Sequence, residues 1–284
     1  MSVYLTKQQV VGSYVSINSS LVSVESKELE ELTQPTTEPL VYEVIRVINS
    51  KVLFKEDHIA RLTKSIEKVE AQKQNSSAVE IVQTQLPKLI SRLQLVNGNL
   101  RVVVSPSIVL VHQNVHHYPT EEMRRNGVIL GEVQVTRENP NMKSIRQNYT
   151  TTVSEAMKQV YFGQVVFSVL LINSDQCYTE GSHSNVFFVK NNTLYTTPDN
   201  LVLIGVTRKY VLQAAQALGM NVVTQCVHTS ELYQFKAFLS GTSLNVLPIH
   251  SVGNVILESE KDQTIKNLEN EYLQIVHRYL DAQE

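Results

Sequence analysis

Apolar residues along this chain follow two periods, and segments of the two kinds alternate from one end to the other. Runs rich in β-branched residues predict strands, because successive strand side chains point to opposite faces. The predicted strands cover residues 41–47, 52–54, 100–104, 128–136, 165–172, 186–189, 194–196 and 237–240. Apolar residues three or four positions apart predict helices. The predicted helices are one capped by Asp57 that carries Ile59, Leu62, Ile66 and Val69, then 77–95, 151–160, one capped by Thr207 and ended by Gly219, and 264–280.

Strands and helices are mixed throughout, and the chain changes character at residues 116–120, where two histidines, a tyrosine and a proline follow one another. The 284 residues are enough for two modest domains, each with its own core. We therefore predict an α+β protein with a smaller domain over residues 1–117, a linker over 118–126 and a larger domain over 127–284.

Composition narrows the classes of protein to consider. The chain is 42% hydrophobic and 18% charged with a formal net charge of -2, which indicates a globular protein without a nucleic-acid partner. The most apolar stretch, 165–172, is too short to span a bilayer and contains Ser168, so we expect no membrane partner. The N-terminus lacks a signal-peptide core, and two cysteines make no disulfide framework. These features predict a cytoplasmic protein.

A carboxylate stands at the start of the segment Thr179-Glu180-Gly181-Ser182-His183-Ser184-Asn185, just before an apolar strand. Two interpretations of Glu180 are open at this point. One is a solvated carboxylate at the edge of a strand. The other is a carboxylate that faces the nitrogen of a cofactor ring and keeps it protonated, which makes the ring a better electron acceptor.

Two short motifs favour the binding of a phosphate. Gly205-Val206-Thr207 opens a predicted helix, where free backbone N–H groups and the helix dipole attract anions. Gly241-Thr242-Ser243 follows a predicted strand and offers flexible backbone with hydroxyl donors. The alternatives are an ordinary helix start and a plain turn. A carboxylate followed by a phosphate-binding helix matches pyridoxal 5′-phosphate, which has a cationic ring and a phosphate.

Two basic residues extend this hypothesis. Arg61 shares a predicted helix with His58, and a guanidinium can hold a phosphate through two hydrogen bonds. Lys143 follows an Asn-Pro-Asn loop, and a lysine whose pKa is lowered by burial beside cations can bond to a carbonyl carbon. The alternatives are a solvated arginine, a surface lysine and a structural histidine.

Together these residues resemble the class IV aminotransferases, the family of PLP fold type IV that includes D-amino acid and branched-chain aminotransferases and aminodeoxychorismate lyase. The resemblance covers about residues 42–248, most of the chain. Its blocks, in family order, are Val41-Tyr42-Glu43-Val44-Ile45-Arg46-Val47, His58-Ile59-Ala60-Arg61-Leu62, Lys143, Thr179-Glu180-Gly181-Ser182 with Ser184-Asn185-Val186-Phe187, Thr197-Pro198, Gly205-Val206-Thr207-Arg208 and Gly241-Thr242-Ser243.

The resemblance implies a fold, an activity and a set of roles. The fold would be the two-domain type IV fold, with the active site between the smaller and the larger domain. The activity would be PLP-dependent transamination between an amino acid and a 2-keto acid through a Schiff base on Lys143, in a cytoplasmic homodimer without a metal. The cofactor would be held at its ring nitrogen by Glu180 and at its phosphate by Arg61, Gly205, Val206, Thr207 and Thr242. The substrate would meet Tyr42 and the backbone of Thr242 and Ser243.

The chain departs from the family pattern at two places. Family members often place an asparagine three or four residues after the lysine, whereas Asn148 stands five residues after Lys143. The Arg-x-His triplet of D-amino acid aminotransferases is missing after the strand at 100–104. The identity and handedness of the substrate therefore stay open. Two alternatives remain, a PLP-dependent aminodeoxychorismate lyase that releases pyruvate and a non-catalytic family member.

Overall fold

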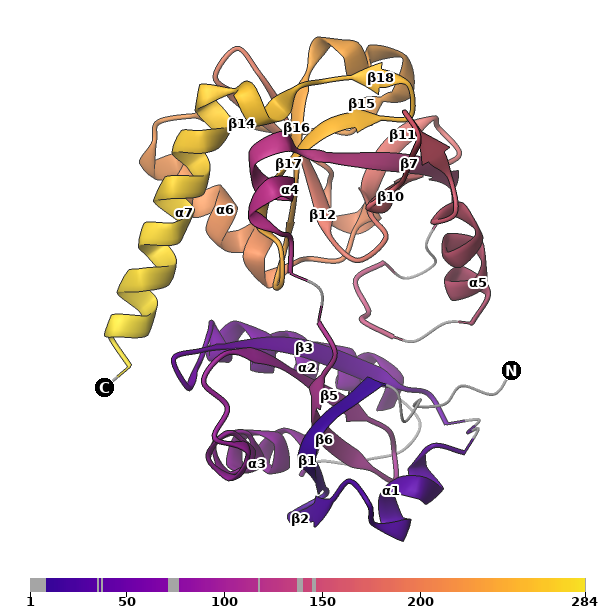
Figure 1. Cartoon of the computed structure of the whole chain (residues 1–284), viewed down its shortest axis with the longest axis vertical. Coiled ribbons are helices and arrows are strands. Elements are labelled where there is room, and N and C mark those ends of the chain that lie inside the picture. Colours follow the sequence, from indigo (N-terminus) through magenta and orange to yellow (C-terminus); the bar gives the residue numbers. More distant parts are fainter. Residues whose placement is uncertain are drawn as a thin grey trace. The chain divides into compact units, whose positions relative to one another are not determined.

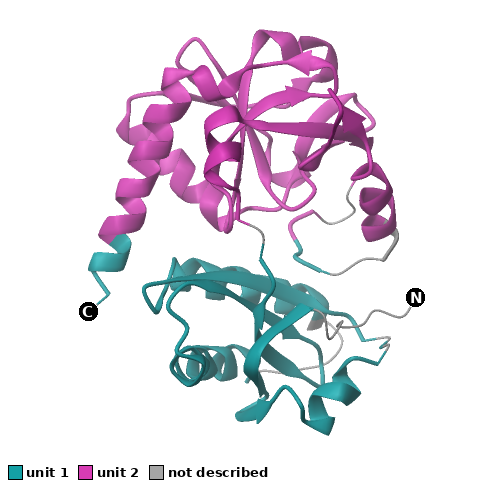
Figure 2. Cartoon of the chain, viewed as in Figure 1, with its two compact units in different colours: residues 1–117, 142–147, 279–284 teal, residues 118–141, 148–278 magenta. Residues whose placement is uncertain are grey.

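The computed structural model describes residues 9–34, 36, 38–70, 77–116, 118–136, 140–144 and 147–283. They mix helices and strands throughout (Figure 1), which confirms the predicted α+β class. The chain forms two compact units, each with its own sheet (Figure 2). Unit 1 comprises Met1–His117, Met142–Gln147 and Tyr279–Glu284, and unit 2 comprises Tyr118–Asn141 and Asn148–Arg278. The domain boundaries expected from the sequence stay a prediction.

Unit 1 is built on a six-stranded antiparallel sheet in the order β2-β1-β6-β5-β3-β4. The strands are β1 (Val10–Ile17), β2 (Ser20–Ser23), β3 (Val41–Ile48), β4 (Lys51–Val52), β5 (Gly98–Val104) and β6 (Val109–Asn114). Buried and half-buried residues alternate along the whole of β3, so that Val41, Glu43, Ile45 and Val47 share the buried face. The sequence predicts this strand almost to its last residue.

Helices cover the buried face of this sheet. α2 (Lys55–Glu70) and α3 (Ala78–Leu93) pack their apolar residues against β3, β5 and β6. α3 stays a single helix although Pro87 lies inside it. The predicted cap at Asp57 is wrong, because α2 begins at Lys55 after Phe54, which has a φ of 51°. The short α1 (Lys27–Leu32) inserts Leu29 into a second apolar cluster with Val15 and Leu110.

Unit 2 is built on a ten-stranded mixed sheet in the order β14-β13-β12-β16-β17-β7-β10-β11-β15, with β18 paired to β17. The strands are β7 (Val128–Gln134), β10 (Ser168–Ile172), β11 (Cys177–Gly181), β12 (Asn185–Lys190), β13 (Thr193–Thr196), β14 (Asn221–Thr224), β15 (Val227–His228), β16 (Lys236–Gly241), β17 (Asn245–Val252) and β18 (Val255–Ile256). β8 (Val160–Tyr161) and β9 (Gln164–Val165) form a separate hairpin. The strand predicted over 165–172 is therefore divided between two elements.

Helices lie before the first strand of this sheet, in the connections between its strands and after its last strand. Among the described residues they are the α-helices α4 (Glu121–Asn126), α5 (Gln147–Ala156), α6 (Val206–Ala217) and α7 (Gln263–Asp281), and the 3₁₀ helices η2 (Asp199–Leu201), η3 (Thr229–Gln234) and η4 (Ser259–Lys261). Gln147 of α5 and residues 279–281 of α7 group with unit 1. α6 buries Val211, Ala214 and Ala215 completely, as its apolar spacing predicts. Within the described residues, no helix has the length and apolar character needed to cross a membrane.

Candidate active site

A buried ionic cluster joins β3 to α2 in unit 1. Arg61 donates from Nε to Oε1 of Glu43 and from Nη2 to Oε2, both at 2.7 Å. Nδ1 of His58 lies 3.0 Å from the same Oε2. Because a carboxylate only accepts, Nδ1 carries the proton of this contact. The side chain of Glu43 has no exposed surface, and that of Arg61 is 12% exposed. The guanidinium is therefore held in one orientation by its partner.

Burial and the neighbouring charges together determine which residues of this cluster are ionised. Burial alone would raise the pKa of Glu43, but the charge of Arg61 and the hydrogen bonds from His58 and Arg61 outweigh it and hold that pKa far below its usual value. Burial lowers the pKa of His58, against the opposing effect of Glu43. The cluster at neutral pH is thus an ionised pair with a neutral imidazole.

Lys143 lies beside β3, and it groups with unit 1 although it is far away in sequence. Its carbonyl accepts a 2.9 Å hydrogen bond from the N–H of Tyr42, and Ser144 forms a bridge with Val41. The Nζ of Lys143 is 5.1 Å from the ring centroid of Tyr42. Its positive charge lowers the pKa values of Glu43 and His58. Lys158, which follows 15 residues later in the sequence, is 71% exposed and pairs with Glu155.

Tyr42 meets a second cation on the sheet. The guanidinium carbon of Arg101 lies 4.8 Å from the Tyr42 ring centroid, and Arg101 is directly opposite His112 in the pairing of β5 and β6. An arginine and a histidine thus lie opposite each other on neighbouring strands of this sheet. Burial lowers the pKa of His112 to about 4, and its Nδ1 lies 2.9 Å from the carbonyl of Gln113.

Glu180 lies near the end of β11 in unit 2 and is 3% exposed, so it is not the solvated carboxylate of the alternative interpretation. Its Oε2 accepts a 3.1 Å hydrogen bond from the N–H of Leu203, which precedes α6. The turn after Glu180 closes with the N–H of Gly181 donating to the carbonyl of Ser184 at 2.8 Å. Tyr149 of α5 donates from its hydroxyl to the carbonyl of Ser182 in this turn at 2.6 Å.

α6 begins at the predicted motif, but not as the sequence suggested. Its N-cap is Gly205, and the predicted cap, Thr207, is the second helical residue. Since glycine has no side chain to cap a helix, the first N–H groups of α6 point to whatever lies ahead of it. Gly205 has a φ of -69°, so no left-handed turn requires glycine there. A Cβ at this position would stand 2.1 Å from Oδ1 of Asn185, and that contact explains the glycine.

Arg208 holds the loop that leads to this helix start. Its side chain is buried, and it donates from Nε to Oγ1 of Thr196 at 3.1 Å and from Nη2 to the carbonyl of Thr197 at 3.0 Å. Nη1 forms a 2.7 Å ion pair with Asp199. The other predicted motif, Gly241-Thr242-Ser243, is the turn between β16 and β17, closed by the N–H of Leu244 bonding to the carbonyl of Gly241 at 3.0 Å.

The predicted site residues thus form two groups, one in each unit. Unit 1 gathers Tyr42, Arg61 and Lys143, and unit 2 gathers the remaining predicted contacts, which are Glu180, Gly205, Val206, Thr207, Thr242 and Ser243. The unit 2 group includes two features whose chemistry suits the predicted cofactor. A buried carboxylate suits a ring N–H, and the uncapped start of a twelve-residue helix suits a phosphate.

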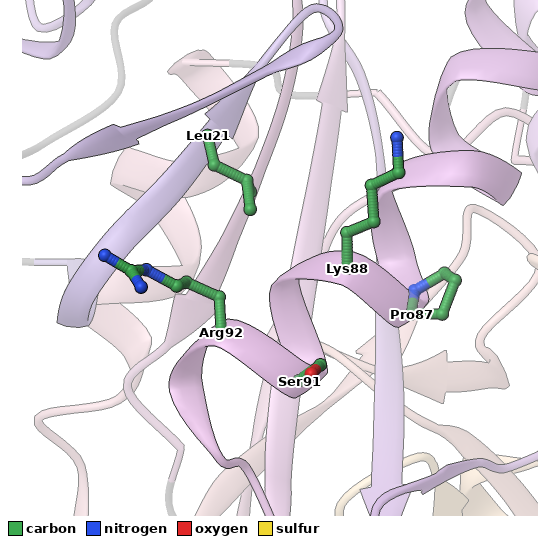
Figure 3. Close-up of a pocket in the computed structure, with 5 residues that line it drawn as sticks. All are labelled: Leu21, Pro87, Lys88, Ser91 and Arg92. Atoms are coloured by element: carbon green, nitrogen blue, oxygen red, sulfur yellow. The ribbon is translucent and has the colours of Figure 1, made fainter.

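A surface hollow of about 490 Å³ in unit 1 lies apart from these residues (Figure 3). It is lined by Leu21 of β2 and by Pro87, Lys88, Ser91 and Arg92 of α3. Arg92 stacks on Tyr14, with its guanidinium carbon 4.0 Å from the ring centroid. None of the predicted site residues contributes to its lining, so we assign it no role in the chemistry.

Comparison with known proteins identifies the family. The model of the amino-transferase class IV family matches residues 40–252. The D-alanine aminotransferase of Bacillus licheniformis is 29% identical over 81% of this chain and 84% of its own. The branched-chain amino acid aminotransferase from Escherichia coli superposes with a TM-score of 0.77, at 19% identity over 94% of this chain and 95% of its own. A putative 4-amino-4-deoxychorismate lyase from Legionella pneumophila superposes with a TM-score of 0.70, at 21% identity over 85% of this chain and 91% of the lyase chain.

The match over most of its length means that this chain belongs to the class IV aminotransferase family. The family, the fold and the enzyme class predicted from the sequence are confirmed. Class IV aminotransferases use pyridoxal 5′-phosphate, which confirms the predicted cofactor as well.

Proposed function

We propose that this chain transfers an amino group between an amino acid and a 2-keto acid, with Lys143 as the residue that bonds to pyridoxal 5′-phosphate. The observation that carries the assignment of Lys143 is its place beside β3. Its backbone carbonyl accepts from the N–H of Tyr42, and its charge acts on His58 and on Glu43, the ion-pair partner of Arg61. The neutral amine of a lysine is the nucleophile that bonds to a carbonyl carbon.

In this proposal each residue has a defined task. When bound, the cofactor supplies a carbonyl carbon for the amino group and a ring that accepts electrons. Nζ of Lys143 takes the proton from Cα of the amino donor and delivers it to the C4′ carbon of the cofactor, and the second half-reaction runs this transfer in reverse on the 2-keto acid. The carboxylate of Glu180 accepts the ring N–H and keeps that nitrogen protonated. The helix start at Gly205, Val206 and Thr207, together with Arg61 and Thr242, holds the phosphate.

The substrate side is proposed to contain Tyr42 and the backbone N–H groups of Thr242 and Ser243. Arg101 joins this set, although the sequence carries no signal for it, because Arg101 stacks on the Tyr42 ring. Both substrates of a transamination carry a carboxylate next to the reacting carbon. A guanidinium beside an aromatic ring is suited to bind such a carboxylate.

The experiment that tests the function is an amino-transfer assay with purified, PLP-loaded protein. A panel of amino donors of both hands is offered with several 2-keto acids, and the new keto acid and the new amino acid are both measured. We expect one molecule of the new keto acid for each molecule of the new amino acid. Double-reciprocal plots of the initial rates should give the parallel lines of a ping-pong mechanism. Loaded protein that transfers no amino group with either hand of donor would contradict the proposal.

A PLP-dependent lyase is the second candidate, because a putative 4-amino-4-deoxychorismate lyase shares the fold. That likeness, at 21% identity, is one of fold alone. A lyase needs no amino acceptor, whereas an aminotransferase stops after one turnover without a keto acid. Release of pyruvate over many turnovers in the absence of a keto acid would favour the lyase.

We also propose a cytoplasmic homodimer. Both cysteines of the chain, Cys177 and Cys226, are free thiols, which suits a reducing compartment. The homodimer is expected from the family resemblance. Sedimentation equilibrium checks it, since a monomer has 32.1 kDa and a homodimer has twice that mass.

A further inference from the structure

Asn185, the first residue of β12, bonds to the loop that leads into α6. Its Nδ2 donates a 2.8 Å hydrogen bond to the carbonyl of Leu203. Asn185 is 7% exposed and Leu203 is half-buried, so little water reaches this bond. Removal of the Asn185 amide would take a buried donor away from this carbonyl, and the loss of such a bond is costly.

Both the N–H and the carbonyl of Leu203 are hydrogen-bonded to buried side chains. Its carbonyl accepts from Asn185, and its N–H donates to Oε2 of Glu180 at 3.1 Å. One residue therefore connects the buried carboxylate of β11 with the buried amide of β12. Any shift of Leu203 that lengthens one of these bonds also disturbs the other.

Asn185 also touches the start of α6. Its Oδ1 lies where it would be 2.1 Å from a Cβ on Gly205, a distance at which no side chain fits. Asn185 therefore packs directly against the backbone of the N-cap residue, two positions after Leu203 in the chain. Its amide thus contacts both ends of the segment 203–205.

We propose that Asn185 is a positioning residue, which fixes the carboxylate of Glu180 and the first turn of α6 relative to each other. This inference rests on the proposed function, in which Glu180 holds the cofactor ring nitrogen and α6 holds its phosphate. The ring nitrogen and the phosphate of one rigid cofactor lie at a fixed separation, so Glu180 and α6 must be held at a matching separation. Asn185 sets that separation through its contacts with Leu203 and Gly205. Asn185 itself touches neither the substrate nor the cofactor.

The test measures the binding of two ligands to apo protein by absorbance titration, namely PLP and pyridoxal, which lacks the phosphate. Asn185→Asp keeps the shape of the side chain but places an oxygen against the carbonyl of Leu203, and Asn185→Ala removes the contact. We expect both to weaken PLP binding by between about fivefold and about a hundredfold, as the loss of one buried hydrogen bond would. Pyridoxal binding should fall less, because it makes no use of α6.

Gly205→Ala gives an independent variant in which Asn185 is retained. The new Cβ must displace the Asn185 amide, so PLP binding should fall in the natural background and fall less when Asn185→Ala is already present. Asn221→Ala, at an exposed residue of the same unit, is the control and should bind both ligands as before. If either Asn185 variant does not fold, the Gly205→Ala result decides.

Two outcomes are kept apart by this design. If the natural protein binds no PLP, the proposed function fails. If the natural protein binds PLP and the folded variants bind PLP and pyridoxal with unchanged affinities, or lose both equally, the positioning role of Asn185 is overturned and the function stands.

Discussion

Arg61 reaches from the second turn of α2 to both carboxylate oxygens of Glu43 on β3, with two donor–acceptor distances of 2.7 Å. This bidentate pair is buried, and it uses the Nε and Nη2 edge of the guanidinium. Arg61 is thereby fixed in direction before any cofactor arrives. In the proposed function, the preformed guanidinium loses little side-chain entropy when it binds a phosphate.

Glu43→Gln should destabilise the protein strongly. The change leaves the charge of Arg61 buried without its partner, which costs on the order of 3 kcal/mol of unfolding free energy. Denaturant unfolding of the apo protein measures it. Glu155→Gln is the matched control, because Glu155 pairs with Lys158 at side-chain exposures of 68% and 71%. That exposed pair should contribute less than about 1 kcal/mol. Equal effects of the two substitutions would contradict the importance of the buried pair.

His112 should make the protein less stable in mild acid. Its pKa is lowered from 6.5 to about 4 in the folded state, by burial first and then by the charge of Arg101, against the hydrogen bond to Gln113. The unfolded chain therefore binds more protons between these values. The stability is complete above pH 6.5 and falls as the pH falls toward 4, by about 2 kcal/mol at pH 5.

The measurement compares unfolding free energies at pH 7 and pH 5 for the natural protein and for His112→Asn. The natural protein should lose about 2 kcal/mol more than the variant between the two values. Other groups titrate equally in both proteins, so the difference isolates His112. Identical pH dependence in the two proteins would show that His112 is not shielded as the structure indicates.

Arg101→Gln should affect substrate binding more than the chemical step. Removal of a guanidinium that binds a carboxylate through charge-assisted hydrogen bonds raises KM by roughly tenfold or more, while kcat changes less. Arg101→Lys keeps the charge and should restore part of the loss. A lower kcat with KM unchanged would place Arg101 outside the substrate side. PLP binding serves as the control and should not change.

The elements with strong periodic signals are the ones that the sequence predicts well. β3, α3 and α7 are located within a few residues, because their apolar spacing is regular. β1 and β6 were not predicted from the sequence, and they pair with each other although almost a hundred residues separate them in the chain. Such pairing depends on the rest of the sheet, and local sequence does not encode it.

The candidate site shows the same division. The motif residues were predicted from local chemistry and family order, whereas the partners that orient them were not. Glu43 could have been found, because it occupies the buried phase of an alternating strand, where a charge requires a partner. Arg101 and His112 had no such signal, since they become neighbours only through the register of β5 and β6. Gly205 was predicted to open a phosphate-binding helix, and nothing in the sequence indicated that its missing side chain makes room for Asn185.

The identity of the lysine that bonds to PLP is the central claim, and borohydride reduction followed by peptide mapping tests it most directly. The PLP-loaded protein is reduced, digested and analysed by mass spectrometry, with Lys143→Ala as the companion sample. We predict one pyridoxyl label, on Lys143, in the natural protein. In the Lys143→Ala variant we predict no specifically labelled lysine. A label on Lys158 or another lysine, with Lys143 unmodified, would contradict the account.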